Sequence, residues 1–587
     1  MSISLAYRNP DTTSMVPSDR FSDWTDLFDR SAAAFQANSL TDDLILDLHQ
    51  KKLTIHRDLD ARELALLYRF SFHVGVNIFI ERLLRVAYSR EMQWSQTFPD
   101  VYYQPRYFTD IDEAILTNYL DFALNYHYLH QIYKTLGGRS IHESGQAPEQ
   151  PRPQDPFLHR RNAVREKVKS VLKRFIEIYA ILTKPNVVGE YSNWMREVLP
   201  LRQMLSFHYP ASRYPVDHKT REAIKDCCRR SFLRRIDDIL PHLSDAEKTG
   251  LSELFAAIID GIIPQSLVEG LTERWSYFEK LIKDWHVQQL HSFIGYYYNE
   301  NFKIFAVLAR RKGATLFGYA HGASNPKGRA DYRNMGCELA LVDYYFTWAG
   351  SDSNWLKGNR NLEHLKISSL GSTYLPTMPK WKKKQISERE LTILYPSGPL
   401  VDFMTDLEEM ATREKTLKHR FHVLTFIKEM MSRYPGTKIL YKPFPGTFTN
   451  DPIKEILGKE MVDGHVRLVI VKPLKLYPKV DIVLWDCIST GFAESIQSEV
   501  PTLVFQSPHE YEESSPMGKA INQELMKCGM IFHDVESGLQ NVHRIVNHLH
   551  DFMEKRKEAV NRFQESVAYP VTKKEFLKKW RLVTGTR

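Results

Sequence analysis

The sequence predicts an α/β protein in which two doubly wound parallel sheets face a cleft, with a large, mainly helical portion at the N-terminal end. Three observations lead to this prediction. Apolar residues recur at three- and four-residue spacing through most of the first 300 residues, as in amphipathic helices. From about residue 300, short apolar runs alternate with helical patterns. A Pro- and Lys-rich linker at 376–390 interrupts this alternation, which restarts after it.

Helical periodicity is strongest in the N-terminal part of the chain. The segment 110–136 begins with acidic residues in its first turn, as helix N-termini favour. A Gly- and Pro-rich stretch at 137–156 then predicts an exposed loop. The expected helices are 58–89, 110–136, 160–183, 219–240, 244–260, 265–285 and 301–311.

The predicted strands are short, fully apolar and followed by small or polar residues. Strands that are buried on both faces read as continuous apolar runs, which is typical of parallel sheets. Ligands of such sheets bind at the carboxyl ends of the strands. The segments that contain the expected strands are 314–320, 337–350, 366–375, 391–398, 437–447, 466–473, 481–485 and 501–508.

These patterns divide the chain into four parts. Residues 1–300 form a mainly helical region that contributes to an acceptor-side domain, and 301–378 form the α/β part of that domain. Residues 386–560 form a donor-binding Rossmann-like domain, and 561–587 form a C-terminal helix. A chain of 587 residues is too long for one core, which agrees with this division.

Composition excludes several classes of protein. With 43% hydrophobic and 26% charged residues, the chain has the composition of a folded protein. The five cysteines are odd in number and have no zinc-ligand spacing, so a disulfide framework is not expected. No apolar run approaches the roughly 20 residues of a membrane helix, and the first residues lack a signal-peptide layout. A cytoplasmic protein is the simplest expectation.

The formal net charge of +8 is concentrated in basic clusters at 152–174, 228–235 and 379–384. Such clusters attract nucleic acid, anionic phospholipid or phosphorylated substrates, or they form solvated helix faces. The sequence has no zinc finger and no RNA-binding strand motif, so we expect no nucleic-acid partner. Contact with an inner membrane through the basic clusters is one expectation that remains open.

The segment KVDIVLWDCISTGFAESIQSEVPTLVF, at 479–505, contains the strongest candidate site. Ser489, Thr490 and Gly491 lie where strand 481–485 gives way to a helix at 489–499. Hydroxyl groups and helix N-terminal amides at this position can hold a phosphate or a ribose. Glu494, one turn later, is placed to accept hydrogen bonds from sugar hydroxyls. The alternative is an ordinary helix cap.

Two α/β units joined by a linker, with a Ser/Thr-Gly-x-x-Glu segment in the second, resemble a GT-B glycosyltransferase. Residues 313–350 also resemble a bacterial surface-carbohydrate transferase family that is often encoded in O-antigen loci. That family has a strand that runs into His-Gly-Gly, followed by an Asp-aromatic-Trp-Gly stretch. His321-Gly322, Asp343 and Trp348 match these motifs, while Ala323 replaces the second Gly and Ala349 precedes Gly350.

The C-terminal half is similar to capsule enzymes that use CMP-activated sugars such as Kdo or sialic acid. Residues 489–495, STGFAES, fit the Ser-Thr/Ser-x-x-Gly-x-Glu-Ala region of those enzymes fairly well. Their His-Pro pair is not matched, because YKPFPGT has Phe444 where the His would stand. The nucleotide contact made by that His is then either absent here or supplied by Lys442.

These resemblances imply roles for individual residues. The nucleotide-sugar donor would bind the C-terminal domain, and a glycan or lipid-linked acceptor would contact Gly322 and Ser324. His321 is the expected catalytic base, because a histidine can take a proton from an acceptor hydroxyl near neutral pH. Asp343 would orient His321 or bind acceptor, or it would be a structural cap. The donor-binding residues would be Ser397, Gly398, Lys442, Ser489, Thr490, Gly491 and Glu494.

No cofactor and no metal is expected. GT-A enzymes hold a divalent ion with an Asp-x-Asp pair, and the triplet of this kind here, Asp110 to Asp112, opens a predicted helix. We interpret it as helix capping. The loop with Tyr511, Glu512 and Glu513 follows strand 501–508 and would close over the donor, or it is a surface loop.

The sequence therefore predicts a glycosyltransferase that transfers a sugar from a nucleotide-activated donor to a bacterial surface-polysaccharide or glycan acceptor. Three alternatives remain open at this stage. A polyol-phosphate transferase of the teichoic-acid type would use a CDP-activated donor, and a non-hydrolysing sugar-nucleotide epimerase would need no acceptor. A catalytically degenerate GT-B scaffold would bind no nucleotide at all.

Overall fold

The computed structural model describes most of the chain in long stretches. These are residues 30–51, 58–91, 182–190, 214–241, 243–320, 341–350, 364–382, 385–398, 413–444, 451–508 and 516–585, with short stretches and single positions between them. Two six-stranded sheets dominate this part of the chain. A separate pair, β1 (Thr97–Phe98) and β2 (Ile141–His142), forms a small parallel sheet of its own.

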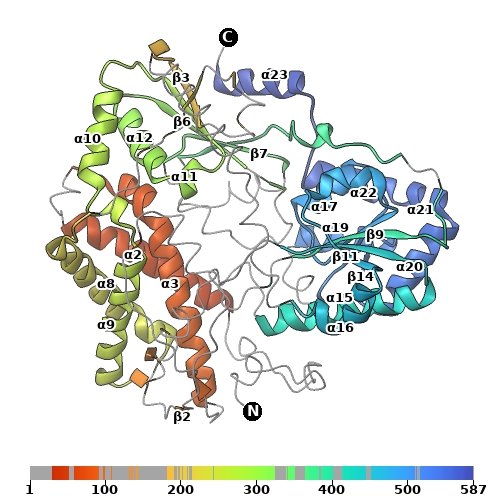
Figure 1. Ribbon diagram of the computed structural model, residues 1–587. Coiled ribbons are helices and arrows are strands. Elements are labelled where there is room, and N and C mark those ends of the chain that lie inside the picture. Colours follow the sequence, from red (N-terminus) through yellow and green to blue (C-terminus); the bar gives the residue numbers. More distant parts are fainter. Residues whose placement is uncertain are drawn as a thin grey trace.

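The N-terminal sheet has the strand order β4-β3-β5-β6-β7-β8, and every neighbouring pair is parallel. Figure 1 shows this sheet on the same side of the molecule as the N-terminal helices. Its strands are β3 (Val187–Glu190), β4 (Met204–Leu205), β5 (Gln289–Ser292), β6 (Thr315–Tyr319), β7 (Tyr344–Thr347) and β8 (Lys366–Ser369).

The C-terminal sheet has the order β11-β10-β9-β12-β13-β14, again parallel throughout. Numbered along the chain, this is the 3-2-1-4-5-6 order of a Rossmann domain. Two Rossmann-type sheets confirm the predicted α/β, GT-B-like fold class. The strands are β9 (Thr392–Pro396), β10 (Lys438–Lys442), β11 (Val466–Leu468), β12 (Ile482–Trp485), β13 (Thr502–Phe505) and β14 (Ile531–Phe532).

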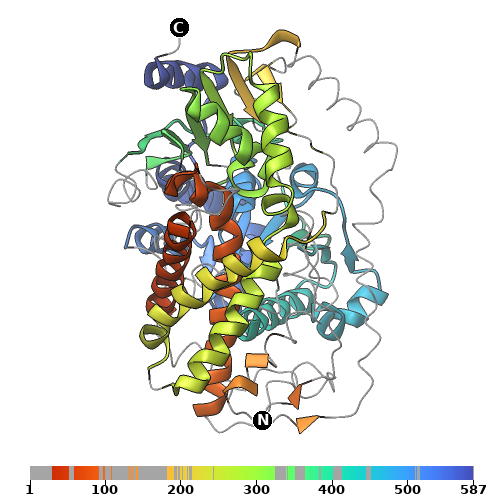
Figure 2. The same cartoon turned by 90° about the vertical axis from the view of Figure 1, so that its left-hand side faces the viewer.

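The N-terminal helices pack on one face of the first sheet and share its core. Leu290 and Leu316 from the strands lie in one buried cluster with Phe79, Phe232 and Phe255 from the helices. The helical region and the sheet therefore form one folded unit, seen from the side in Figure 2. The helices are α2 (Arg30–Lys51), α3 (Ala61–Glu91), α8 (His218–Ile239), α9 (Asp245–Ile262), α10 (Leu271–Leu281), α11 (Gly295–Tyr298) and α12 (Glu300–Arg311).

The last helix, α23 (Lys573–Thr584), covers the opposite face of the same N-terminal sheet. Its buried Phe576 and Trp580 pack in one cluster with Phe317 and Tyr319 of β6. The indole Nε1 of Trp580 donates to the Tyr319 hydroxyl at 2.8 Å. Alternation along β6, with Leu316 toward the helices and Phe317 toward α23, is the period-two pattern of a sheet covered on both faces.

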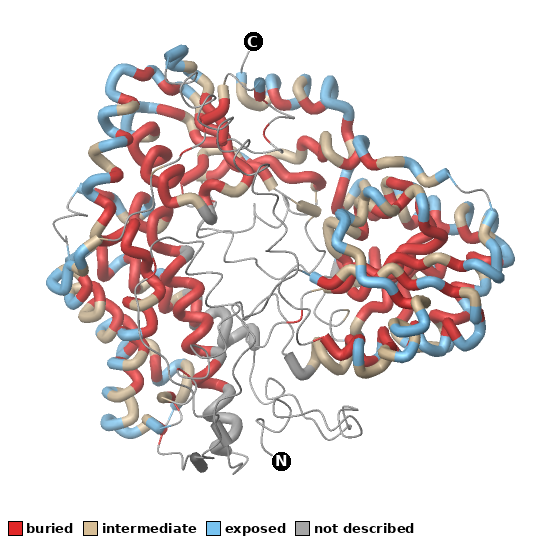
Figure 3. Tube along the Cα trace, in the orientation of Figure 1, coloured by how far each residue is buried: buried red, intermediate tan, exposed pale blue. Residues whose placement is uncertain are grey.

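The C-terminal sheet encloses a separate core. Figure 3 shows buried segments concentrated in each sheet and in the helices packed on it. Most apolar side chains of β9, β12 and β13 are only 0–1% exposed, as expected for parallel strands that are buried on both faces. The helices around this sheet are α15 (Arg413–Arg433), α16 (Ile453–Val462), α17 (Thr490–Gln497), α19 (Pro516–Lys527), α20 (Val535–Asn547), α21 (Leu549–Lys555) and α22 (Lys557–Ser566).

The sequence-based division differs from the structure in two places. Strands β3, β4 and β5 lie before residue 300, so the first sheet draws half of its strands from the region expected to be mainly helical. The stretch 376–390 is also more ordered than a free linker. Trp381 donates through its amide to the Ser498 carbonyl and through Nε1 to the Val480 carbonyl, both at 2.8 Å. This stretch is therefore attached to the C-terminal domain.

Among the described residues, no single helix is long and apolar enough to cross a membrane. One bent pair within α3, Ala61–Arg69 and Ser71–Leu84, passes on length and composition alone with an angle of 60° between its halves. Leu66, Leu67 and Ile78 of this pair are fully buried in the N-terminal core. The apolar character of α3 is accounted for by packing in that core.

Candidate active site

Each sheet has a point where the chain reverses its direction of winding. In the C-terminal sheet this switch point lies between β9 and β12, and in the N-terminal sheet it lies between β3 and β5. Ligands of open α/β sheets bind outside the carboxyl ends of the strands at such a point, where the two diverging loops leave a crevice. Ser397 and Gly398 follow β9, and residues 486–490 follow β12, so most predicted donor residues lie beside the C-terminal switch point.

Ser397 and Gly398 hold the turn after β9 in place. The Ser397 hydroxyl is buried, lies 3.3 Å from the Tyr441 hydroxyl and accepts the Phe444 amide at 3.3 Å. The Gly398 amide donates to both carboxylate oxygens of Asp486, at 2.8 and 3.0 Å. Both groups are engaged within the protein here, and their donor-binding role stays a prediction.

A buried charge network lies beneath this turn, and sequence reasoning missed it. Arg420 of α15 forms ion pairs with Asp451 at 2.8 Å and Asp486 at 3.1 Å. Its Nη2 also donates to the Gly398 carbonyl at 2.8 Å. Tyr395 donates to Asp486 at 3.1 Å, and the Tyr441 hydroxyl donates to Asp451. The network ties β9, β10, β12 and α15 together directly below the switch point.

The electrostatics of this network favour a permanently charged arginine. Burial lowers the pKa of Arg420, but Tyr395, Asp486 and Asp451 outweigh burial and raise the pKa above its usual value. Burial also raises the pKa of the Tyr395 hydroxyl, which therefore stays protonated as a hydrogen-bond donor. Asp486 stood in the segment singled out from sequence, but nothing in the sequence paired it with Arg420 or Asp451.

The N-terminus of α17 is uncapped. Ser489, in the N-cap position, has extended backbone angles and makes no side-chain cap hydrogen bond within the described chain. The Thr490 hydroxyl instead accepts the Ala323 amide at 3.2 Å. The first-turn amides of a helix have no intrahelical partner, and the helix dipole makes this end attractive to anions. Because no described side chain caps these amides, the start of α17 favours binding of a phosphate over the alternative of an ordinary helix cap.

Gly491 is required by packing rather than by a ligand. A Cβ added there would lie 2.2 Å from the Trp485 ring, which no real contact allows. The Trp485 Nε1 donates to the Ser495 hydroxyl at 3.2 Å and fixes the ring against the helix. The absence of a side chain at Gly491 therefore lets the backbone approach Trp485, and its donor-binding role stays a prediction.

Glu494 faces two phenol groups. It accepts a hydrogen bond from Tyr374 at 2.8 Å and from Tyr477 at 3.3 Å. Burial raises the pKa of Glu494, and the two phenol hydrogen bonds lower it in part. Tyr374 follows β8 of the N-terminal sheet, so Glu494 lies where the two sheets approach each other.

Lys442 ends β10, two strands from β12. Its side chain is half-buried, and burial lowers its pKa. Within the described part of the chain, Lys442 forms no ion pair with a carboxylate. A lysine that is partly desolvated without a carboxylate partner has unused attraction for an anion. The nucleotide contact of Lys442 stays a prediction.

The loop after β6 reaches the same place from the N-terminal side. His321 and Ser324 lie outside the described residues, while Gly322 and Ala323 lie within them. Besides the Ala323 hydrogen bond to Thr490, a Cβ added to Gly322 would lie 2.6 Å from the Thr490 Oγ1. Two segments chosen independently from sequence therefore meet in space.

Asp343 lies at the amino ends of the strands of the N-terminal sheet, away from the loop after β6. It precedes β7, and its Oδ2 accepts the Leu316 amide at 2.8 Å near the amino end of β6. The strand is Tyr344–Thr347, so Asp343 lies directly before its amino end and not near its carboxyl end. Four residues of strand, about 13 Å, separate Leu316 from Ala320. The structure thus favours the cap alternative over a role beside His321.

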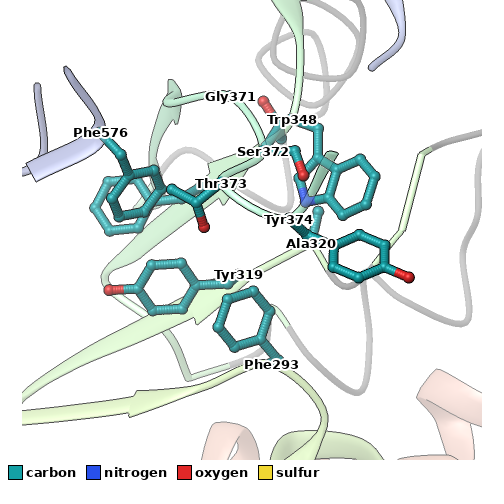
Figure 4. Close-up of a pocket in the computed structure, with 11 residues that line it drawn as sticks. Phe293, Tyr319, Ala320, Trp348, Gly371, Ser372, Thr373, Tyr374 and Phe576 are labelled. Carbon is teal, nitrogen blue, oxygen red and sulfur yellow. The ribbon is translucent and has the colours of Figure 1, made fainter. Parts of the chain in front are cut away.

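A small aromatic cavity lies at the carboxyl ends of β5 to β8. Figure 4 shows Phe293, Tyr319 and Phe576 on one side of it and Trp348 on the other. Its volume of about 20 Å³ holds about one water molecule, so the cavity cannot admit a sugar in this conformation. Trp348, matched to the family motif, packs with the C-terminal core and is 4% exposed.

Tyr511 lies over a wider pocket of about 480 Å³, beyond the ends of β13 and β14. Its hydroxyl accepts the Gln523 Nε2 at 2.9 Å, and its ring meets the His533 ring edge to face at 5.8 Å. Glu512 and Glu513 lie outside the described residues, so closure over the donor stays a prediction. Within the described residues, no group of three or more His, Cys, Asp and Glu side chains is placed to hold a metal ion.

Comparison with known proteins decides the family. The model of the LIC12162 family transferases matches residues 22–582, nearly the whole chain. The chain belongs to this family. This LIC12162 family member is therefore a transferase. A search of curated proteins gave no significant match.

Solved structures similar to this LIC12162 family transferase are remote. TarM of S. aureus, crystallised with Fondaparinux, alpha-GlcNAc-glycerol and UDP, has 14% identity and a TM-score of 0.36, over 53% of this chain and 58% of TarM. S. aureus MnaA with UDP has 12% identity and a TM-score of 0.34, over 54% of this chain and 79% of MnaA. MurG of Acinetobacter baumannii has 13% identity and a TM-score of 0.31, over 53% of this chain and 77% of MurG. The chain thus matches less than two thirds of TarM, and none of these likenesses is close enough to transfer an activity.

Proposed function

We propose that this transferase moves a sugar from a nucleotide-activated donor to a surface-polysaccharide or glycan acceptor, with the donor at the β9–β12 switch point. One observation carries the proposal. The loop after β6 contacts the N-terminus of α17 through Ala323 and Thr490, so the carboxyl edges of both sheets meet at one place. A group transfer needs donor and acceptor side by side, and this junction is where two Rossmann-type domains could each present one substrate.

In this proposal the donor phosphates bind the amides at the start of α17 and the ammonium group of Lys442. The helix dipole and a half-buried cation both stabilise the negative charge that develops on the leaving nucleotide. Arg420, with its two carboxylates, keeps the turn at Gly398 rigid without contacting the donor. Glu494 exchanges one of its phenol partners for a sugar hydroxyl.

The transfer breaks the bond between the sugar C1 and the phosphate oxygen and forms a bond from C1 to an acceptor oxygen. The acceptor hydroxyl loses its proton to His321, the base proposed on the sequence motif, and the nucleotide leaves with the electron pair of the broken bond. Acceptor contacts from Gly322 and Ser324 complete this proposal. None of these steps uses a metal ion, and activity in the presence of EDTA tests that point.

The biological setting remains part of the proposal. The motifs at 313–350 and 489–495 favour an O-antigen-like or capsule-like polysaccharide as the product, built in the cytoplasm on a glycan or lipid-linked acceptor. A lipid-linked acceptor would require the enzyme to work at the surface of an inner membrane.

Cys487 offers a direct test of donor binding. It lies between Asp486 and the start of α17 and is half-buried, whereas burial raises the pKa values of Cys227, Cys228 and Cys528. CMP, CDP, UDP and GDP are added in turn, and melting temperature and iodoacetamide alkylation of each cysteine peptide are measured. We expect one nucleotide to raise the melting temperature and to slow alkylation of Cys487.

Two lysines of β10 provide a matched pair of variants for this assay. Lys442→Met should weaken binding of the effective nucleotide by roughly 10- to 100-fold, as loss of a hydrogen bond to a charged group does. Lys438→Met, at the exposed amino end of the same strand, should leave binding unchanged. If no nucleotide protects Cys487 or raises the melting temperature, the glycosyltransferase proposal fails and a scaffold role takes its place. Turnover of a nucleotide-sugar without acceptor would indicate an epimerase.

A further inference from the structure

The edge of the C-terminal sheet carries exposed apolar side chains. Phe444, Leu468, Ile470 and Val471 are 44%, 36%, 51% and 40% exposed, and together we call them the edge patch. Leu468 pairs with Tyr441 in the register of β10 and β11, and the Val469 amide donates to the Tyr441 carbonyl at 2.8 Å. The strand register therefore brings the ends of β10 and β11 together, with Leu468 at the carboxyl end of β11 and the rest of the edge patch just beyond the two strands.

The edge patch is surrounded by positive charge. Residues 464–480 contain no Asp or Glu, but they include Arg467, Lys472, Lys475 and Lys479, all exposed. Within the described chain, none of these four side chains forms an ion pair with a carboxylate. Lys472 acts on Glu494 only at longer range, and exposed apolar side chains flanked by these cations match a surface that is both apolar and negatively charged.

The basic clusters chosen from sequence have different surroundings. In the cluster at 228–235, Arg229 pairs with three carboxylates, and Arg234 and Arg235 pair with Asp47 and Asp43 of α2. These arginines therefore hold helices together. Lys380 of the cluster at 379–384 pairs with Glu499, and the cluster at 152–174 lies outside the described residues.

A second copy of the chain fits the edge patch poorly. β11 is an edge strand, so its free backbone groups could pair with another strand. Exposed positive charges on an edge strand, such as Arg467, disfavour such pairing, and two copies meeting here would bring four positive charges on each chain together. The remaining partner with suitable chemistry is an anionic lipid surface.

We propose that the edge patch contacts an anionic phospholipid membrane. Ile470 and Val471 enter the interface between headgroups and acyl chains, and Lys472 and Lys475 bind the headgroup phosphates. Tyr477, in the short helix that follows, donates to Glu494. Binding through the edge patch therefore holds the carboxyl edge of the C-terminal sheet close to the lipid. The proposal does not depend on the proposed sugar transfer, because it concerns a different surface and a different measurement.

Vesicle sedimentation tests the proposal with the full chain. Purified protein is mixed with phosphatidylcholine vesicles that contain either no phosphatidylglycerol or 30% of it, at low and high salt. We expect binding to the anionic vesicles that falls at high salt, because charge attraction is screened. Lys472→Gln/Lys475→Gln should lower the partition coefficient roughly 30-fold, and Ile470→Ser/Val471→Ser roughly tenfold.

Matched controls separate the edge patch from general surface effects. Val462→Ser changes an apolar residue that is 88% exposed beside Asp463, and Lys573→Gln/Lys574→Gln removes two exposed charges on α23. Both control variants should bind as the wild type does, and melting temperatures check that every variant is folded. Absence of vesicle binding by the wild type, or equal binding by all four variants, overturns the proposal. A dimer that Ile470→Ser/Val471→Ser dissociates overturns it in favour of a second copy.

Discussion

The two switch points of this molecule are built on the same plan but with opposite electrical character. At β3–β5, Glu190 is 8% exposed and accepts the Ser292 hydroxyl at 2.5 Å and the Gly295 amide at 3.0 Å. At β9–β12, Asp486 accepts the Gly398 amide in a similar way, but Arg420 pairs with that carboxylate. In each case a carboxylate at the end of one central strand fixes the turn that follows the neighbouring strand.

The two switch points differ in whether the backbone amides at the start of the nearby helix are free to bind a ligand. Glu190 takes up the amides of Ile294 and Gly295 at the start of α11, so that end of the N-terminal crevice is already occupied by negative charge. Among the described residues no carboxylate caps α17, and Lys442 lies on β10, two strands from β12. An anion is therefore favoured at the C-terminal switch point and opposed at the N-terminal one. Four measurements test this comparison.

The largest effect is expected from Arg420→Met. The change leaves Asp451 and Asp486 buried without their cation, which typically costs 3–5 kcal/mol, so we expect about that loss in the free energy of unfolding. Chemical denaturation followed by tryptophan fluorescence measures it. Arg467→Met, on exposed β11, should change stability by less than about 0.5 kcal/mol. A similar small loss for both variants would contradict the role given to the buried network.

The N-terminal sheet should show an acid-sensitive step through His291. Burial lowers the pKa of His291 to about 3, while an unfolded histidine titrates near about 6.5. Between these values the unfolded chain binds the additional proton, so stability falls as pH falls, by at most about 1.4 kcal/mol per pH unit. His291→Gln should flatten this part of the stability–pH curve. His550→Gln, on the surface of α21, should leave it unchanged, and an unchanged slope in both variants would refute the assignment.

Gly491→Ala should destabilise the start of α17. The new methyl group would overlap the Trp485 ring, and overpacking of this kind costs about 1–3 kcal/mol. Gly458→Ala is the matched control, because a Cβ in that helix meets nothing within 4 Å, and alanine there should be neutral or stabilising. Thermal unfolding compares the two. Partial recovery of stability in Gly491→Ala with Trp485→Phe would locate the strain at this contact.

The smallest effect is expected at the contact between the sheets. Thr490→Val keeps the shape of the side chain and removes the acceptor of the Ala323 amide, which should cost about 1 kcal/mol. Ser489→Ala, one residue earlier, removes a hydroxyl that makes no cap hydrogen bond and should cost only a few tenths of that amount. Equal losses in the two variants, measured by denaturation, would show that Thr490 does not join the sheets.

Strand and helix positions were largely predictable because they depend on local periodicity. The apolar run at 481–485 and the amphipathic stretch at 489–499 correspond closely to β12 and α17. Strands β3, β4, β5 and β14 were not predicted, because short strands next to strong helical patterns give little periodic signal. Asp343 lies at the amino end of β7, because the strand begins only at Tyr344, after the apolar residues Leu341 and Val342.

The sequence by itself determined the fold class, because the spacing of apolar residues along the chain distinguishes buried strands from amphipathic helices. It also brought attention to the loop at 321–324 and the helix start at 489–491. Only the tertiary structure decided that these two segments meet, that Arg420 joins Asp451 and Asp486, and that α23 returns to the first sheet. Such contacts join residues 30 to 260 positions apart, and the free energy that forms them comes from burial and charge pairing in three dimensions.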